Sequence, residues 1–246
     1  RMVRLPEQRA VMNSMGFPGQ GLEPSVKRLQ SSQRYKDRVL VSISGTIEDE
    51  IFECLRRSQD FVSGIELNIS SPNTTGLRIF HEPARLRGLI EGLVSVKKVP
   101  LFVKLPPWPR DDENRRELLK LAATAVDAGV DGLVIANTHP IESSRLQVGR
   151  GGLSGAPLFE HTELMIADIQ AQVQGEVAII ACGGVSTGEH VWKLLASGAS
   201  AVQLYTAFIY EGPGLPARIN KRVSKLMIAA GITNIGDISG EPPSIR

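Results

Sequence analysis

The chain has 246 residues, of which 42% are hydrophobic and 22% charged, and its formal net charge is +2. This charge balance excludes a basic footprint for nucleic acid, and two cysteines are too few for a disulfide scaffold. No apolar run approaches the roughly 18 residues that cross a bilayer. A length of about 250 residues suffices for one large core and is typical of a (β/α)8 barrel.

Six short apolar runs with many β-branched residues predict strands. They lie at 39–44, 65–70, 100–105, 132–136, 178–181 and 201–204. The runs are nearly continuous rather than alternating, which is typical of parallel strands buried on both faces.

Between these runs, apolar residues recur at intervals of three and four, which predicts helices. One stripe runs from Leu86 to Val94 and begins after Pro83. A second runs from Leu118 to Val126, enters through Asp111 and Asp112, and ends at Gly129. Further helices are expected from Val191 to Leu195, ending at Gly198, and over 215–230.

Strand–helix alternation predicts an α/β protein with a parallel sheet. Six units are compatible with a doubly wound open sheet, whereas a (β/α)8 barrel requires two more. Residues 1–32 are rich in turn-forming, charged and polar residues, so no strand–helix pair is expected before residue 39. A barrel would therefore lack about a quarter of its units in this chain, which begins at Arg1 rather than at a methionine.

Polar residues gather where the predicted strands end. Period-two alternation places Glu66, Asn68 and Ser70 on one strand face, opposite Leu67 and Ile69. A polar face inside a buried sheet is costly unless it is hydrogen-bonded or binds a ligand. The segment 68–74 is equally compatible with a capped turn.

Lys104 ends another apolar strand, where a lysine is rarely solvated like one at the surface. It could form a Schiff base, act as a base, or place a positive charge against an anionic cofactor. The structural alternative is an ion pair with a carboxylate such as Glu66. Asn137 and Thr138 end the next strand, and by themselves they are a weak signal.

Two glycine-rich turns, at 151–155 and 182–186, each precede a predicted helix. Glycines allow the backbone to approach a phosphate, and helix N-termini offer unpaired amide donors. Together with Tyr205 and Thr206 after the last strand, they predict a mononucleotide phosphate site. Cys182 is expected to be a core residue rather than a nucleophile, and the four histidines lack metal-ligand spacing, so no metal is expected.

The segment from Asn68 to Arg78, with sequence NISSPNTTGLR, closely resembles the signature of dihydroorotate dehydrogenases, and specifically of the quinone-linked class 2 enzymes. Counterparts of other family motifs occur before and after this segment, in the family's order, over nearly the whole chain. They are RLPE at 4–7, NSMGF at 13–17, VKLP at 103–106, DGL at 131–133, NT at 137–138, GGLSGAPL at 151–158, GGVS at 183–186 and VQLYT at 202–206.

The resemblance implies a single FMN-binding (β/α)8 barrel domain over residues 1–246, with about the first two strands absent from this chain. It also implies oxidation of dihydroorotate to orotate in pyrimidine biosynthesis, with electrons passed to a quinone. Ser71 matches the family's catalytic base for C5 of the substrate, while the hydride from C6 would go to flavin N5. We expect Thr74 to receive the proton from Ser71, because serine is a poor base at neutral pH.

Further roles carry over from the family position by position. The substrate-binding set is Asn13, Gly16, Phe17, Asn68, Asn73, Asn137 and Thr138. The cofactor-binding set is Asn68, Lys104, Ala136, Gly155, Gly184, Tyr205 and Thr206. Departures from the family pattern are Ala136 in place of a threonine, Ser42 and Ser44 in place of an asparagine near the flavin, and Pro18 in place of an asparagine.

The class 2 resemblance further implies peripheral contact with the inner membrane through a segment not present here. The location would be the cytoplasmic face in bacteria or the mitochondrial inner membrane in eukaryotes. Three alternatives stay open: a related flavin enzyme for another dihydropyrimidine, a class 1-type enzyme that uses fumarate or NAD, and a truncated non-catalytic form.

Overall fold

The computed structural model describes residues 1–71, 73–74, 76–109 and 111–244. Pro72 and Thr75 of the motif at 68–78 lie outside the described residues. The chain forms two compact units, which we call the central unit (Met15–Val134) and the terminal unit (Arg1–Ser14 with Ile135–Arg246).

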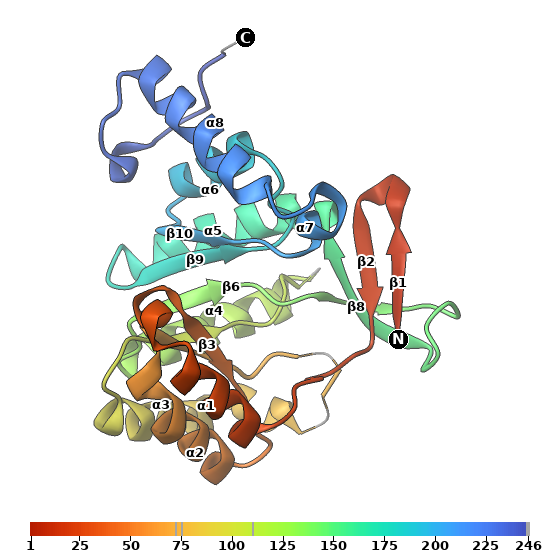
Figure 1. Cartoon of the computed structure of the whole chain (residues 1–246), viewed down its shortest axis with the longest axis vertical. Coiled ribbons are helices and arrows are strands. Elements are labelled where there is room, and N and C mark those ends of the chain that lie inside the picture. The colour runs from red at the N-terminus through yellow and green to blue at the C-terminus, as the bar shows by residue number, and fades with distance from the viewer. Residues whose placement is uncertain (72, 75, 110, 245–246) are drawn as a thin grey trace. The chain divides into compact units, whose positions relative to one another are not determined.

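The central unit contains the first four predicted strands, as parallel neighbours (Figure 1). They are β3 (Leu40–Ile43), β4 (Gly64–Asn68), β5 (Leu101–Lys104) and β6 (Gly132–Ile135), hydrogen-bonded in the order β3-β4-β5-β6. Each observed end lies within two residues of the predicted one. The side chains of Ile65, Leu67 and Val103 on β4 and β5 are fully buried, which stabilises this arrangement.

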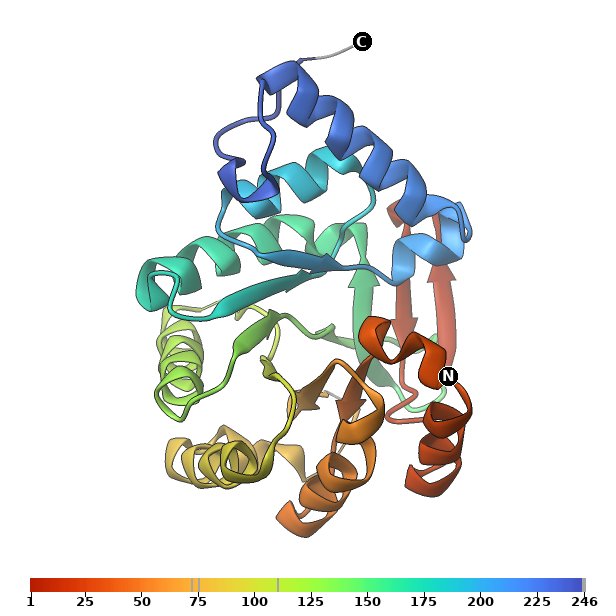
Figure 2. The same ribbon diagram turned by 60° about the vertical axis from the view of Figure 1, so that its left-hand side comes forward.

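Four helices accompany these strands, and α2, α3 and α4 lie side by side in Figure 2. They are α1 (Leu22–Ser31), α2 (Glu48–Ser58), α3 (Pro83–Val96) and α4 (Asp112–Asp127). The predicted start of α4 is confirmed, because the Asp111 carboxylate accepts a hydrogen bond from the Asn114 N–H at 2.9 Å. The predicted stripe of α3 is its buried face.

The terminal unit contains a four-stranded antiparallel sheet in the order β1-β2-β8-β7. Its strands are β1 (Met2–Leu5), β2 (Ala10–Asn13), β7 (His139–Glu142) and β8 (Arg150–Gly155). The turn expected at 151–155 was wrong, because these residues belong to strand β8. Residues 1–32, where no strand–helix pair was expected, contain the antiparallel strands β1 and β2 and the helix α1, which were not predicted. The glycines at 151–155 allow β8 to lie close to β2, because a Cβ on Gly151 would lie only 2.3 Å from the Asn13 carbonyl oxygen.

The last two predicted strands, β9 (Ala178–Cys182) and β10 (Ala201–Gln203), form a parallel pair in the terminal unit. The N–H of Ala136, just after β6, donates to the Cys182 carbonyl at 2.8 Å. The helices are α5 (Phe159–Val173), α6 (Gly188–Ala196), α7 (Thr206–Glu211) and α8 (Leu215–Ala230), and α8 packs along α6 (Figure 2). The prediction for 215–230 is confirmed.

Short 3-10 turns, labelled η, complete the secondary structure. They lie at Pro6–Gln8, Gln33–Arg38, Gln59–Phe61, Leu77–His81, Ala156–Leu158 and Ile235–Asp237. Among the described residues, no helix combines the length and apolar character needed to cross a membrane.

Asp131 ties together the starts of β5 and β6, away from the polar strand ends. Its carboxylate accepts a hydrogen bond from the Leu101 N–H at 2.7 Å and another from the Lys97 ammonium. Replacing Asp131 with alanine leaves the Leu101 N–H without this acceptor, so we expect a loss of about 1–3 kcal/mol in the free energy of unfolding. Urea unfolding followed by circular dichroism measures this loss.

The matched control for Asp131→Ala is Asp127→Ala. Asp127 pairs with Arg87 at 3.2 Å, but its side chain is 64% exposed. Exposed pairs contribute little, so the control should change the free energy of unfolding by less than about 0.5 kcal/mol. Equal losses for the two variants would contradict the role given to Asp131.

Candidate active site

The loop after β4 in the central unit brings together several predicted site residues. The hydroxyl oxygens of Thr74 and Ser71 lie 3.3 Å apart, within hydrogen-bonding distance. The Thr74 N–H also donates to the Ser71 carbonyl at 3.4 Å. The expected Ser71–Thr74 contact is therefore present. Because hydroxyl hydrogens rotate, either oxygen can donate in this pair.

The predicted substrate residues Gly16 and Phe17 belong to a loop that reaches the same place. A Cβ on Gly16 would lie 3.7 Å from the Asn73 carbonyl oxygen and 3.8 Å from the Thr74 hydroxyl oxygen. Gly16 has a φ of +64°, which glycine adopts without steric cost. Phe17 is 46% exposed, so its ring is not part of the central core.

Asn68 ends β4 and shapes the start of this loop. Its side-chain oxygen accepts hydrogen bonds from the Ser70 N–H at 3.2 Å and the Ser70 hydroxyl at 3.4 Å. Its carbonyl accepts from the Ser44 hydroxyl at 2.8 Å. The capped-turn alternative thus describes the local structure correctly, and the turn holds Asn68 and Ser70 in fixed positions next to Ser71.

Lys104 ends β5 and lies opposite Asn68 in the strand register. Its ammonium is 3.6 Å from Glu66 Oε2, and the two side chains are only 14% and 9% exposed. The Ser42 hydroxyl donates to the other Glu66 oxygen at 2.9 Å. The ion-pair alternative for Lys104 is therefore realised, and the pair fixes a buried positive charge beside the polar end of β4.

His81 was missed by the sequence reasoning, although it lies close to the motif. Its Nε2 is 2.9 Å from the Ile69 carbonyl oxygen, two residues before Ser71. Burial lowers the pKa of His81, the hydrogen bond to Ile69 opposes that shift, and nearby Arg78 adds to it. The signal available in the sequence was the position of His81, three residues after the end of the motif at 68–78.

The terminal unit places Asn13 and the Asn137–Thr138 pair beside β8. Asn13 ends β2 and is in register with Gly152, while β7, which starts one residue after Thr138, pairs with β8 on its other edge. The Asn137 side-chain oxygen accepts a hydrogen bond from the Thr138 N–H at 2.8 Å. Ala136, immediately before them, is buried.

The predicted phosphate-binding residues lie at crowded backbone positions of the terminal unit. A Cβ on Gly184 would lie 2.4 Å from the Phe159 nitrogen, at the start of α5. A Cβ on Gly155 would lie 2.4 Å from the Arg9 carbonyl oxygen and 3.0 Å from the Thr206 methyl group. The nearest atom to each of these two Cβ positions belongs to the main chain, so the backbone is closely packed here, which is compatible with a phosphate held by backbone amides.

Thr206 and Tyr205 differ in their contributions to this region. Thr206 is buried, and its hydroxyl donates to the Ser154 hydroxyl at 2.8 Å. Tyr205, in contrast, is 79% exposed. Across the described residues, no group of three or more His, Cys, Asp or Glu side chains could hold a metal ion.

Comparison with known proteins identifies the relatives of this chain. The model of the family "Dihydroorotate dehydrogenase" matches residues 1–227. A dihydroorotate dehydrogenase (quinone) of Brucella anthropi is 35% identical, with 96% of this chain and 68% of that protein covered. One from Parvibaculum lavamentivorans is 34% identical, with 98% and 71% covered.

Solved structures agree with this assignment. Ligand-free DHODH from Eimeria tenella superimposes with a TM-score of 0.85 at 33% identity, and covers 98% of this chain and 76% of its own. The complex of the Eimeria tenella protein with ferulenol gives a TM-score of 0.84 at 31% identity, with 98% and 73% covered. The fold is therefore of the α/β barrel class, as expected, in a chain shorter than those relatives. The chain belongs to the dihydroorotate dehydrogenase family.

Proposed function

We propose that this protein is a quinone-linked dihydroorotate dehydrogenase that oxidises (S)-dihydroorotate to orotate in de novo pyrimidine biosynthesis. The observation that carries this proposal is the Ser71–Thr74 hydroxyl pair at 3.3 Å, next to the ordered Asn68–Ser70 turn. Within this family, that loop is where the resemblance of the sequence places the catalytic base.

Ser71 would take the proton from C5 of the substrate. A serine hydroxyl is a weak base at neutral pH, so it must pass a proton on as it accepts one. Thr74 offers the first acceptor, because its oxygen is within hydrogen-bonding distance and can accept as well as donate. His81 supports the loop through the Ile69 carbonyl rather than through Ser71 itself.

We propose FMN as the cofactor, with Asn68, Lys104 and Ala136 facing the flavin and Gly155, Gly184, Tyr205 and Thr206 at its phosphate. When bound, FMN supplies the acceptor for the hydride from C6. Lys104 contributes a fixed positive charge, which Glu66 holds in place at 3.6 Å. A side chain at Gly155 or Gly184 would displace the neighbouring backbone of Arg9 or Phe159 in the proposed phosphate region.

The substrate would be held by Asn13, Asn68, Asn73, Asn137 and Thr138, with Gly16 and Phe17 in the adjoining loop. An amide side chain offers both donors and an acceptor, which matches a pyrimidine ring that carries both. Hydrogen bonds within the protein already orient the side-chain oxygens of Asn68 and Asn137. We propose that all of these residues act within one flavin-binding domain over residues 1–246.

We further propose a quinone as the electron acceptor and peripheral association with the inner membrane, at the cytoplasmic face in bacteria or in mitochondria. Steady-state oxidation of dihydroorotate with a ubiquinone analogue, fumarate or NAD as the acceptor tests this assignment. Turnover is expected with the quinone. Turnover with fumarate or NAD alone would instead indicate a class 1-type enzyme.

The packing of Gly184 against Phe159 leads to a prediction about the affinity for FMN. In Gly184→Ala the new methyl group would clash with the Phe159 backbone at 2.4 Å, so we expect FMN to bind at least about tenfold more weakly. Gly231→Ala is the matched control, because Gly231 has a similar positive φ, +70° against +72°, but nothing within 4 Å of the new atom. Flavin fluorescence titration compares the two, and wild-type affinity in Gly184→Ala would contradict the assignment.

A further inference from the structure

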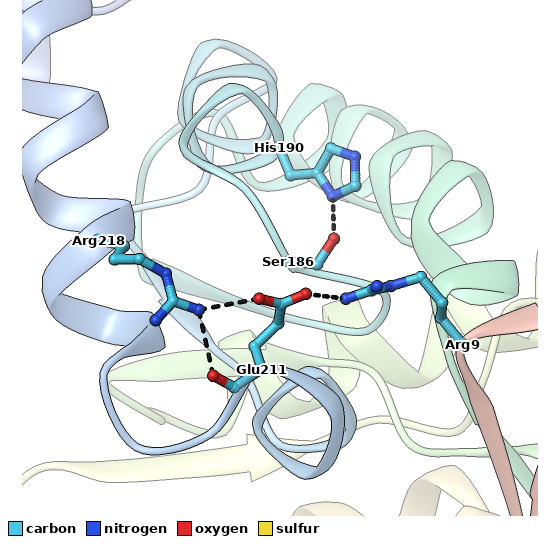
Figure 3. A network of polar contacts seen from close by, with 5 residues as sticks. All are labelled: Arg9, Ser186, His190, Glu211 and Arg218. Atoms are coloured by element: carbon cyan, nitrogen blue, oxygen red, sulfur yellow. Dashed lines mark hydrogen bonds and ion pairs between the residues drawn. The ribbon is translucent and has the colours of Figure 1, made fainter. Parts of the chain in front are cut away.

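His190, in the first turn of α6, contacts two parts of the proposed phosphate region: the glycine turn at 183–186 and the first residue of α5. Its Nδ1 is 3.4 Å from the Ser186 hydroxyl oxygen, as Figure 3 shows, and its side chain is hydrogen-bonded to the Gly184 backbone. Its ring stacks on Phe159, the first residue of α5, with ring centroids 3.9 Å apart and an interplanar angle of 22°. None of the family motifs includes this residue.

These contacts connect His190 to the Gly183–Gly184 turn through Phe159. Gly184 packs against the Phe159 backbone, and the Phe159 ring packs against His190. The Thr187 hydroxyl accepts a hydrogen bond from the His190 N–H at 3.1 Å, which fixes the start of α6. The imidazole is therefore held in one position relative to both the turn and α5.

The charged groups around His190 come from three helices and the C-terminal segment. Glu189 and Lys193 share its helix, and Glu163 faces it from α5. Arg222 on α8 pairs with Glu189 at 2.6 Å, and Lys193 lies 3.4 Å from Glu241. The neighbouring strand β10 (Ala201–Gln203) carries no charged residue.

Burial lowers the pKa of His190, while the Gly184 hydrogen bond and the carboxylates Glu189 and Glu163 oppose that shift. Burial therefore favours the neutral ring before a ligand binds. A dianionic phosphate near the Gly184 backbone would favour the charged imidazolium and raise this pKa.

We propose that His190 is a positioning residue for the flavin phosphate, which holds the Gly183–Gly184 turn against the start of α5 and gains a proton when the phosphate binds. This inference rests on the proposed flavin site. It adds a residue outside the recognised motifs and a dependence of cofactor affinity on pH.

The sign of that dependence follows from linkage. A pKa that is higher in the complex than in the free protein means that binding takes up a proton, so affinity increases as the pH falls between the two pKa values. If the phosphate raises the pKa of His190 by about one unit, the gain is at most about tenfold. The phosphate of FMN loses charge in the same range, which weakens binding in every variant alike.

The experiment measures FMN dissociation constants by fluorescence from about pH 8 to about pH 5.5 for the wild type, His190→Gln and His161→Gln. Glutamine keeps hydrogen-bonding capacity but cannot become charged. The wild-type affinity relative to His190→Gln should increase up to about tenfold toward the acidic end. His161→Gln, which alters an exposed histidine of α5, should follow the wild type.

Riboflavin serves as the phosphate-free probe, and its affinity should show no dependence on His190. A nuclear magnetic resonance titration of the His190 ring in the wild type, with and without FMN, should show a higher pKa in the complex, and it requires no variant to fold. Parallel pH curves for the wild type and His190→Gln, or an unchanged ring pKa, would overturn the role of His190 alone. Failure of the wild type to bind FMN at any pH would overturn the proposed function as well.

Discussion

Ser71→Ala is expected to slow the reduction of bound flavin by dihydroorotate by about 10²–10⁴-fold, the usual contribution of a positioned general base. The serine oxygen is the group placed to receive the C5 proton, and its contact with Thr74 gives that proton an exit. Anaerobic stopped-flow absorbance of the flavin measures the rate. FMN affinity should remain within about twofold of the wild type, because Ser71 is not assigned to the cofactor.

Three further variants separate catalysis from folding in this experiment. Ser63→Ala removes a serine hydroxyl just before β4, at the end of the strand opposite to the active-site loop, where it donates to the Val39 carbonyl at 2.9 Å, and it should leave the rate unchanged. Thr74→Val should slow reduction, and Thr74→Ser should restore most of the rate because it retains the hydroxyl. A Ser71→Ala protein that reduces its flavin at a near-normal rate would remove Ser71 from the mechanism.

Lys104→Met is expected to impair both stability and flavin chemistry. The substitution removes the Lys104 ammonium from beside Glu66, whose side chain is only 9% exposed, and breaking such a pair costs about 3–5 kcal/mol. It also removes the positive charge proposed to stabilise reduced flavin. Urea unfolding measures the first effect, and the flavin reduction rate measures the second.

The double variant Glu66→Gln with Lys104→Met distinguishes these two effects. It removes both charges, so stability should largely recover, and the Ser42 hydroxyl can still bind the side chain at position 66. Flavin reduction should stay slow because the cation is still missing. Recovery of the wild-type reduction rate in the double variant would show that Lys104 acts only as the partner of Glu66.

The parallel strands were predictable because their sequences are short apolar runs, and β4 and β6 are buried along almost their whole length. Strands β3 to β6, β9 and β10 appear in the sequence as short apolar runs, and each observed end lies within two residues of its prediction. The antiparallel sheet was not predictable in this way. Its strands β1, β2 and β7 are four residues long, and β8 has the sequence RGGLSG, in which glycines serve close strand approach rather than a turn.

The site was predictable to a different extent at each residue. Ser71 and Thr74 are three residues apart in a turn, so local geometry alone brings their hydroxyls together. The Lys104–Glu66 pair depends on the register of β4 against β5, so the sequence could only offer it as one alternative. His190 was missed because its contacts with Phe159 and Gly184 arise from the packing of α5 against α6.

The most direct test of the central claim is a single-turnover measurement on the purified, FMN-loaded protein without oxygen. Dihydroorotate should bleach the oxidised-flavin absorbance and yield one orotate per flavin, and a ubiquinone analogue added afterwards should restore that absorbance. Flavin that binds but is not reduced by dihydroorotate would contradict the assignment of this chain as an active dihydroorotate dehydrogenase.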